Sequence, residues 1–131
     1  MPARDRYRNP VKSELEHHPA MDTSESDRQL IEKILVEYAR IPYSHSDIRL
    51  LTVFDRAQDR YLLMLNGWEG VRHEHGCLVH VDIIEGKFWI HRDGTEYSIA
   101  QELIDAGIPK DRIVLAFRSL EKRRLTEFAV T

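Results

Sequence analysis

The chain has 131 residues, of which 42% are hydrophobic and 31% charged, and its formal net charge is −3. This is enough for one domain with a modest core, and the charge disfavours a dedicated DNA binder, which usually carries a basic surface. No apolar run approaches the roughly 20 residues of a membrane span, and the N-terminus lacks the apolar stretch of a secretion signal. With a single cysteine, Cys77, an intramolecular disulfide is excluded, and we expect a cytoplasmic protein without membrane contact.

Residues 1–22 combine prolines and mixed charges with few aliphatic side chains. Such a segment cannot bury enough apolar area to offset the entropy of ordering, so we predict a disordered arm followed by a single domain over residues 23–131. Ser26 and Gln29 have the spacing of a capping box and predict the start of a helix that Pro42 ends. Its buried stripe recurs with helical period and consists of Leu30, Ile31, Ile34, Leu35 and Tyr38.

Two apolar runs, residues 48–54 and 61–66, flank a short polar connector and predict an antiparallel hairpin. Because nearly every position in both runs is apolar, we predict burial on both faces. Gly67 and Gly70 bracket Trp68 in a predicted turn.

A third predicted strand, residues 77–84, alternates in polarity, with Cys77, Val79, Val81 and Ile83 on one face. A two-residue turn at Glu85–Gly86 leads into a fourth strand, residues 88–91, and sets Asp82 opposite Trp89 and His80 opposite His91. A three-residue loop is the alternative, and it sets His80 opposite Ile90. We favour the two-residue turn because it places Phe88 and Ile90 on the same face as the aliphatic residues of the third strand.

A second helix follows Asp93–Gly94, capped either by Asp93 with Glu96 or by Thr95 with Ser98. Gly107 suits the position just after its C-terminus. Its buried stripe is Ile99, Ala100, Leu103 and Ile104, and residues 113–117 form a fifth apolar strand. The order α-β-β-β-β-α-β predicts an α+β domain: a mostly antiparallel sheet of about five strands with two main helices packed on it.

The density of polar, ligand-type side chains near the third strand identifies one candidate site. In the favoured register His80, Asp82, Trp89 and His91 share the face opposite the aliphatic residues. We predict that this face contacts another protein, since a polar surface around an aromatic side chain is typical of an interface. Imidazole and carboxylate are also zinc ligands, so His80, Asp82 and His91 could serve a metal-dependent hydrolase. No nucleophile or phosphate-loop motif accompanies them, and we expect no catalytic residues, no metal and no cofactor.

The C-terminal region is locally basic. Its candidate nucleic-acid contacts are Arg118, Lys122, Arg123 and Arg124, interrupted by Glu121. Short charge runs are more often a solvated surface than a binding site.

Several multi-residue motifs occur in order along residues 28–117 and beyond: GCLVHVDI at 76–83, EGKFWI at 85–90, DGTE at 93–96, IAQELIDAGIPKDRIVL at 99–115 and TEFAV at 126–130. On these motifs the chain resembles the XisI family of cyanobacterial element excision controlling factors. The segment RSLEKRRL, residues 118–125, departs from the family pattern because it lacks a proline.

The resemblance implies a genetic role rather than a reaction. XisI-like proteins are named for the control of site-specific excision of a DNA element, in which they act with a recombinase and a companion, XisH. We therefore expect a non-enzymatic accessory protein that contacts a XisH-like companion and copies of itself and that associates with DNA indirectly, through the recombinase. The alternatives are a DNA-binding module that uses the basic C-terminal segment, and the metal-dependent hydrolase.

Overall fold

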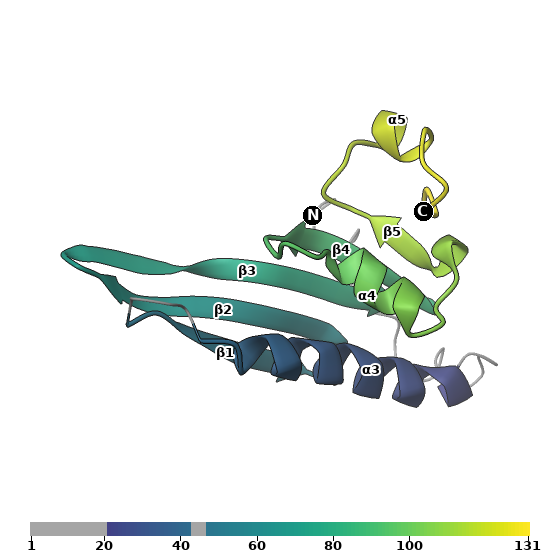
Figure 1. Cartoon of the computed structure of the whole chain (residues 1–131). Coiled ribbons are helices and arrows are strands. Elements are labelled where there is room, and N and C mark those ends of the chain that lie inside the picture. Colours follow the sequence, from purple (N-terminus) through teal and green to yellow (C-terminus); the bar gives the residue numbers. More distant parts are fainter. Residues whose placement is uncertain (1–20, 43–46) are drawn as a thin grey trace, which may run out of the picture.

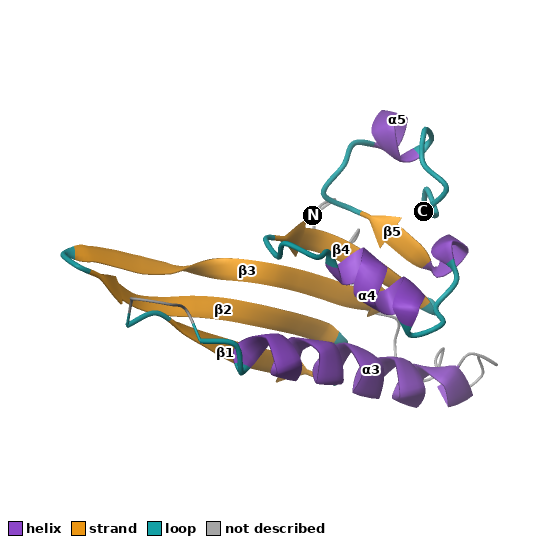
Figure 2. Ribbon diagram, viewed as in Figure 1, coloured by secondary structure: helices purple, strands orange, loops and turns teal. Residues whose placement is uncertain are grey.

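The computed structural model describes residues 21–42 and 47–131, which form a five-stranded sheet with two helices on one face (Figures 1 and 2). The strands lie in the order β1-β2-β3-β4-β5; all neighbours are antiparallel except β4 and β5. The elements are α3 (Met21–Ala39), β1 (Arg49–Asp55), β2 (Arg60–Glu69), β3 (Arg72–Ile84), β4 (Lys87–Asp93), α4 (Ile99–Asp105), a 3₁₀ turn (Lys110–Arg112), β5 (Ile113–Leu115) and α5 (Leu120–Arg123). The predicted fold class and element order are confirmed.

The core lies between the helices and one face of the sheet, which we call the inner face. The predicted stripes of both helices contribute fully buried side chains, among them Ile31, Leu35, Ile99 and Leu103. They pack against inner-face residues of the strands: Tyr61, Leu63, Val79, Val81, Ile83, Phe88 and Ile90. The prediction that the helices cover the aliphatic face is confirmed. The apolar stripes of the helices are buried by packing against this face.

Helix α3 begins at Met21, so the predicted arm boundary at residue 22 lies inside a helix and Ser26 is not its N-cap. Two ion pairs hold the first turns of this helix against the rest of the domain. Arg28 donates to Asp59 at 2.7 Å, and Asp27, almost fully buried, accepts from Arg112. These contacts tie the polar first turns, which precede the apolar stripe, to the turn between β1 and β2 and to the 3₁₀ turn before β5. Residues 1–20 of the predicted arm lie outside the described residues.

Strand β1 corrects the prediction of two-sided burial. Leu51 and Val53 are 48% and 47% exposed on the face opposite the helices, the outer face. Their β2 partners there, Met64 and Leu62, are only half-buried. The apolar run therefore has one buried face and one open face.

The turn between β3 and β4 is the predicted two-residue turn. Glu85 and Gly86 have φ values of 50° and 76°, and Ile84 pairs with Lys87. Positive φ at both central residues is the geometry that continues the right-handed twist of a hairpin. Asp82 lies opposite Trp89, as predicted.

Two register shifts correct the rest of the predicted pairing. Between β3 and β4, Val81 pairs with Ile90 but His80 pairs with Arg92, so His91 is an extra residue and does not lie directly opposite His80. Between β2 and β3, Leu63 pairs with Val79 and Met64 with Cys77, which leaves Leu78 as the extra residue.

The second bulge moves Cys77 off the face on which we predicted it. Cys77 pairs with Met64 on the outer face, whereas Leu78 packs against the core and contacts Gly94. A single extra residue inverts the alternation on one side of it, which sequence periodicity does not reveal.

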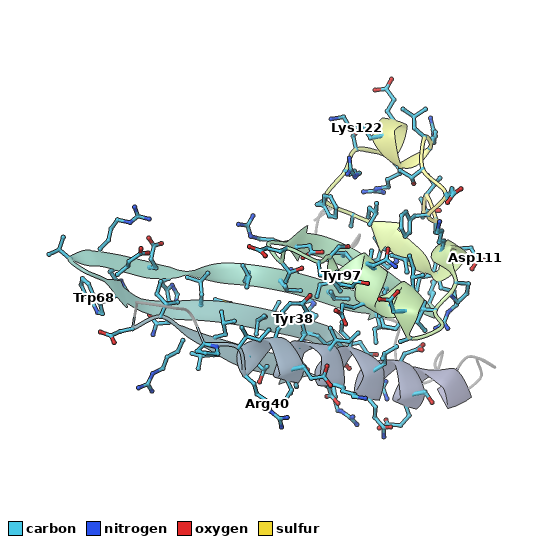
Figure 3. The ribbon with its side chains drawn as sticks, viewed as in Figure 1. Tyr38, Arg40, Trp68, Tyr97, Asp111 and Lys122 are labelled. Atoms are coloured by element: carbon cyan, nitrogen blue, oxygen red, sulfur yellow. The ribbon has the colours of Figure 1, made fainter. Side chains whose placement is uncertain are left out.

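The hairpin of β2 and β3 is longer than predicted and extends past α3 (Figures 1 and 3). The predicted turn at Gly67–Gly70 is wrong, because the ladder continues to the pair Glu69 and Arg72. Trp68 lies near the hairpin end, 52% exposed, with its ring 4.7 Å from that of His73.

Helix α4 starts at Ile99, which is later than predicted, because neither Asp93 nor Thr95 is its N-cap. Ser98 is its N-cap and accepts from the Gln101 amide, while Asp93 accepts from the Ile99 amide at 2.7 Å. Gly107, with φ of 99°, follows the helix as predicted.

Candidate functional site: a histidine–aspartate cluster on the outer face

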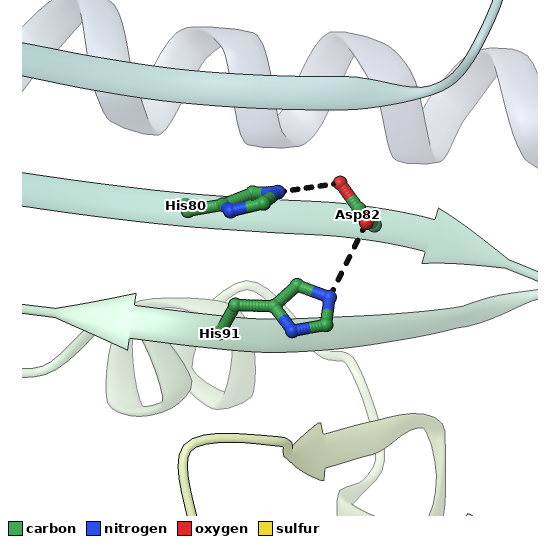
Figure 4. A group of neighbouring side chains, drawn as sticks. All are labelled: His80, Asp82 and His91. Atoms are coloured by element: carbon green, nitrogen blue, oxygen red, sulfur yellow. Dashed lines mark hydrogen bonds and ion pairs between the residues drawn. The ribbon is translucent and has the colours of Figure 1, made fainter. Parts of the chain in front are cut away.

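The residues His80, Asp82 and His91 meet on the outer face, as Figure 4 shows. Nε2 of His80 lies 2.9 Å from one carboxylate oxygen of Asp82, and Nε2 of His91 lies 3.2 Å from the other. The two imidazole rings are 4.7 Å apart between centroids and tilted by 42°. An ionised carboxylate only accepts hydrogen bonds, so each imidazole presents an Nε2–H to it.

The local sequence explains how three side chains converge from two strands. His80 and Asp82 are two residues apart on β3 and therefore point to the same face. His91 comes from the bulge of β4, where the extra residue turns its side chain toward Asp82. The sequence prediction that these residues lie together is confirmed, although through a bulge rather than a direct cross-strand pair.

Burial and hydrogen bonding act in opposite directions on Asp82. Its side chain is 3% exposed, whereas those of His91 and His80 are 14% and 33% exposed. Burial alone raises the pKa of Asp82, but the hydrogen bonds from His80 and His91 outweigh it and lower the pKa to about 2. The carboxylate is therefore a fixed negative charge at neutral pH.

The cluster opens into a hollow on the outer face that is lined by Arg60, His80, Asp82, His91 and Ala116. Nε of Arg60 lies 4.0 Å from the carboxylate of Asp82. One ligand atom from each cluster residue lies within 4.8 Å of the others, so the three side chains could hold a metal ion. Among the described residues, the lining of this hollow adds no second carboxylate and no nucleophile to the cluster.

Trp89, the fourth residue of the predicted interaction face, lies on the same face and is half-buried. Its ring lies 5.9 Å from the guanidinium of Arg123, and its buried Nε1 has no hydrogen-bond partner in the described part of the chain. The C-terminal segment of the chain thus covers part of the indole. A contact of these four residues with another protein stays a prediction.

The four basic C-terminal residues do not form one group. Arg118, Lys122 and Arg124 are exposed, and Figure 3 shows Lys122 pointing outward from α5. Arg123 instead donates to three backbone oxygens, those of Arg118 at 2.9 Å, Val130 at 3.2 Å and Ala116 at 3.3 Å. Arg123 therefore closes the C-terminal segment on itself and is the least available of the four for nucleic acid.

Sequence reasoning missed the apolar half of the outer face, Leu51 and Val53 beside Leu62 and Met64. The signal was present as a continuous apolar run, but a run without alternation cannot distinguish a strand covered on both sides from one with an open apolar face. None of the helices in the described ranges has the length and apolar content that a membrane span requires.

Comparisons with known proteins agree with the motifs and the fold. The family model for XisI protein matches residues 21–130. A XisI-like protein from Anabaena variabilis ATCC 29413 has a TM-score of 0.74 and 31% identity, covering 81% of this chain and 97% of that one. The fdxN element excision controlling factor XisI from the same organism has a TM-score of 0.67 and 34% identity, covering 79% and 95%. Comparison with curated proteins gave no significant match. With a family match over residues 21–130 and the same fold, the chain belongs to the XisI family.

Proposed function

We propose that this protein is a non-enzymatic controlling factor for the site-specific excision of a DNA element and that it acts by binding a XisH-like companion. Family membership and the name of the fdxN excision factor support the role in excision control. The observation that carries the mode of action is the open outer face of the sheet.

The outer face has the composition of a protein interface. Leu51 and Val53 leave about half of their surface in solvent, and the polar cluster around Asp82 lies on the same face. A central apolar area with polar groups at its rim is the usual anatomy of such a contact. Among the described residues, strand β1 is also an edge of the sheet, and an edge strand can extend such a contact through its backbone.

Charge favours a protein partner over direct DNA binding. The net charge is −3, whereas affinity for DNA depends on phosphate contacts from a basic surface. Within the C-terminal segment Arg123 is committed to backbone oxygens, and Glu121 and Glu127 offset part of the remaining positive charge.

The test is the affinity of the purified chain for a purified XisH-like companion, measured by calorimetry. The variant Leu51→Asp/Val53→Asp places two charges in the apolar half of the outer face. Since truncating one central interface residue often costs about 2 kcal/mol, we expect affinity to fall roughly thirtyfold or more. Leu125→Asp is the matched control, because Leu125 is 85% exposed but lies in the C-terminal segment. Circular dichroism confirms that both variants are folded.

Two results contradict the proposal. One is a companion that binds the Leu51→Asp/Val53→Asp variant as tightly as the wild type. The other is DNA binding by the chain alone that weakens steeply with salt and is lost when Arg118, Lys122 and Arg124 are replaced, which supports the DNA-binding alternative.

A further inference from the structure

We propose that His80, Asp82 and His91 form a binding site for a divalent first-row transition metal, with zinc as its best-suited ion. This inference goes beyond excision control and does not rest on the proposed function. It also goes against our expectation from the sequence of no metal.

The donor atoms are already close to a coordination geometry. In a tetrahedral site with ligands near 2.1 Å, neighbouring donor atoms are about 3.4 Å apart. The carboxylate of Asp82 lies 2.9 Å and 3.2 Å from the two Nε2 atoms, and one donor from each residue falls within 4.8 Å. To bind, the two imidazoles rotate so that all three donors point at one ion.

The choice of donors selects the class of ion. Imidazole nitrogen suits zinc, copper, nickel and iron, whereas magnesium and calcium prefer oxygen donors alone. To bind, each neutral imidazole moves its proton from Nε2 to Nδ1 and presents a lone pair to the ion. The carboxylate of Asp82, whose side chain is almost fully buried, supplies the negative charge.

The site leaves a coordination position open to the hollow. The three protein ligands line that hollow together with Arg60 and Ala116, so a fourth ligand enters from solvent. Arg60 stands 4.0 Å from the carboxylate, and its positive charge favours an anionic fourth ligand such as chloride or a carboxylate. Two histidines, one carboxylate and an open position resemble the ligand set of open zinc sites.

The experiment titrates the metal-free, full-length chain with zinc chloride by calorimetry. We expect one saturable site per chain. Loss of a hydrogen-bonding group behind a metal ligand already costs about 10- to 100-fold in affinity, so loss of a ligand itself in His91→Ala or Asp82→Asn should cost at least roughly tenfold. Two controls remove the other histidine pairs, His73→Ala/His75→Ala at the hairpin and His17→Ala/His18→Ala near the N-terminus. Both controls should keep the wild-type affinity.

A second measurement needs no variant at the site. In nitrogen-detected correlation spectra of the wild type, zinc should move the ring-nitrogen resonances of His80 and His91 and leave those of His73 and His75 unchanged. The proposal is overturned if the wild type shows no saturable zinc binding, if the loss of His73 and His75 abolishes it, or if the resonances of His80 and His91 do not respond.

Discussion

Replacing Arg123 with alanine should loosen the C-terminal segment, which covers part of the outer face, near Trp89. The guanidinium donates to the carbonyl oxygens of Arg118, Ala116 and Val130 and lies over the ring of Trp89. At about 1 kcal/mol net for each hydrogen bond and about 0.5–1 kcal/mol for the cation–π contact, the upper limit is roughly 4 kcal/mol. Two of the bonds are 3.2 Å or longer, so we expect about 2–3 kcal/mol.

The assay is urea denaturation followed by the fluorescence of Trp89 in a Trp68→Phe background, because the chain has two tryptophans. With a slope near 1.5 kcal/mol per molar urea, the transition seen by Trp89 should move down by about 1.3–2 M. Hydrogen exchange of residues 116–130 should accelerate in parallel, while exchange in β2 and β3 stays unchanged if the segment opens locally.

Arg124→Ala is the matched control. Arg124 is the next residue along the chain, is equally basic and is exposed. Its removal should leave both the urea midpoint and the exchange rates within error of the wild type. If the free energy of unfolding of Arg123→Ala also stays within about 0.5 kcal/mol of the wild type, Arg123 does not hold the C-terminal segment in place, because an ordinary surface substitution changes stability by no more than that.

Three further predictions concern the fold and the site. Gly67→Ala places a Cβ 2.2 Å from the carbonyl oxygen of Asp47 and should lower stability by about 1–3 kcal/mol. At the control position, Gly76→Ala, the added Cβ meets open space, so equal thermal midpoints of the two variants would contradict this prediction. Arg112→Met leaves the buried Asp27 without its partner and should lower the free energy of unfolding by about 3 kcal/mol in urea denaturation. Adding Asp27→Asn should restore part of that stability. If it restores none, the loss comes from the packing of Arg112 and not from its ion pair. The purified chain with zinc should not hydrolyse phosphodiesters, and turnover that Asp82→Asn abolishes would restore the hydrolase hypothesis.

Periodicity and turn chemistry predicted the parts of the fold that depend on local sequence. The stripes of α3 and α4 and the turn at Glu85–Gly86 follow from helical spacing and from the tolerance of glycine for positive φ. The start of α3 at Met21 did not follow from the capping-box signal, and neither did its ion pairs to Asp59 and Arg112, which are distant in sequence.

The sequence predicted which residues form the candidate site but not how their side chains are arranged. His80 and Asp82 follow from strand alternation alone, but the position of His91 depends on a bulge that shifts the ladder by one residue. The same kind of irregularity at Leu78 moved Cys77 to the outer face. The apolar half of that face was missed because the exposure of Leu51 and Val53 depends on which face of the sheet the helices cover. A continuous apolar run does not indicate which face that is.

The central claim, that the outer face binds the companion protein, is tested most directly by site-specific photo-crosslinking. A photo-reactive amino acid replaces Val53 on the outer face or, as the control, Glu37 on the exposed side of α3. Irradiation of each variant mixed with the companion should give a crosslinked heteromer from position 53 and none from position 37. Crosslinking from position 37 with none from position 53 would place the companion on the helical side and contradict the account.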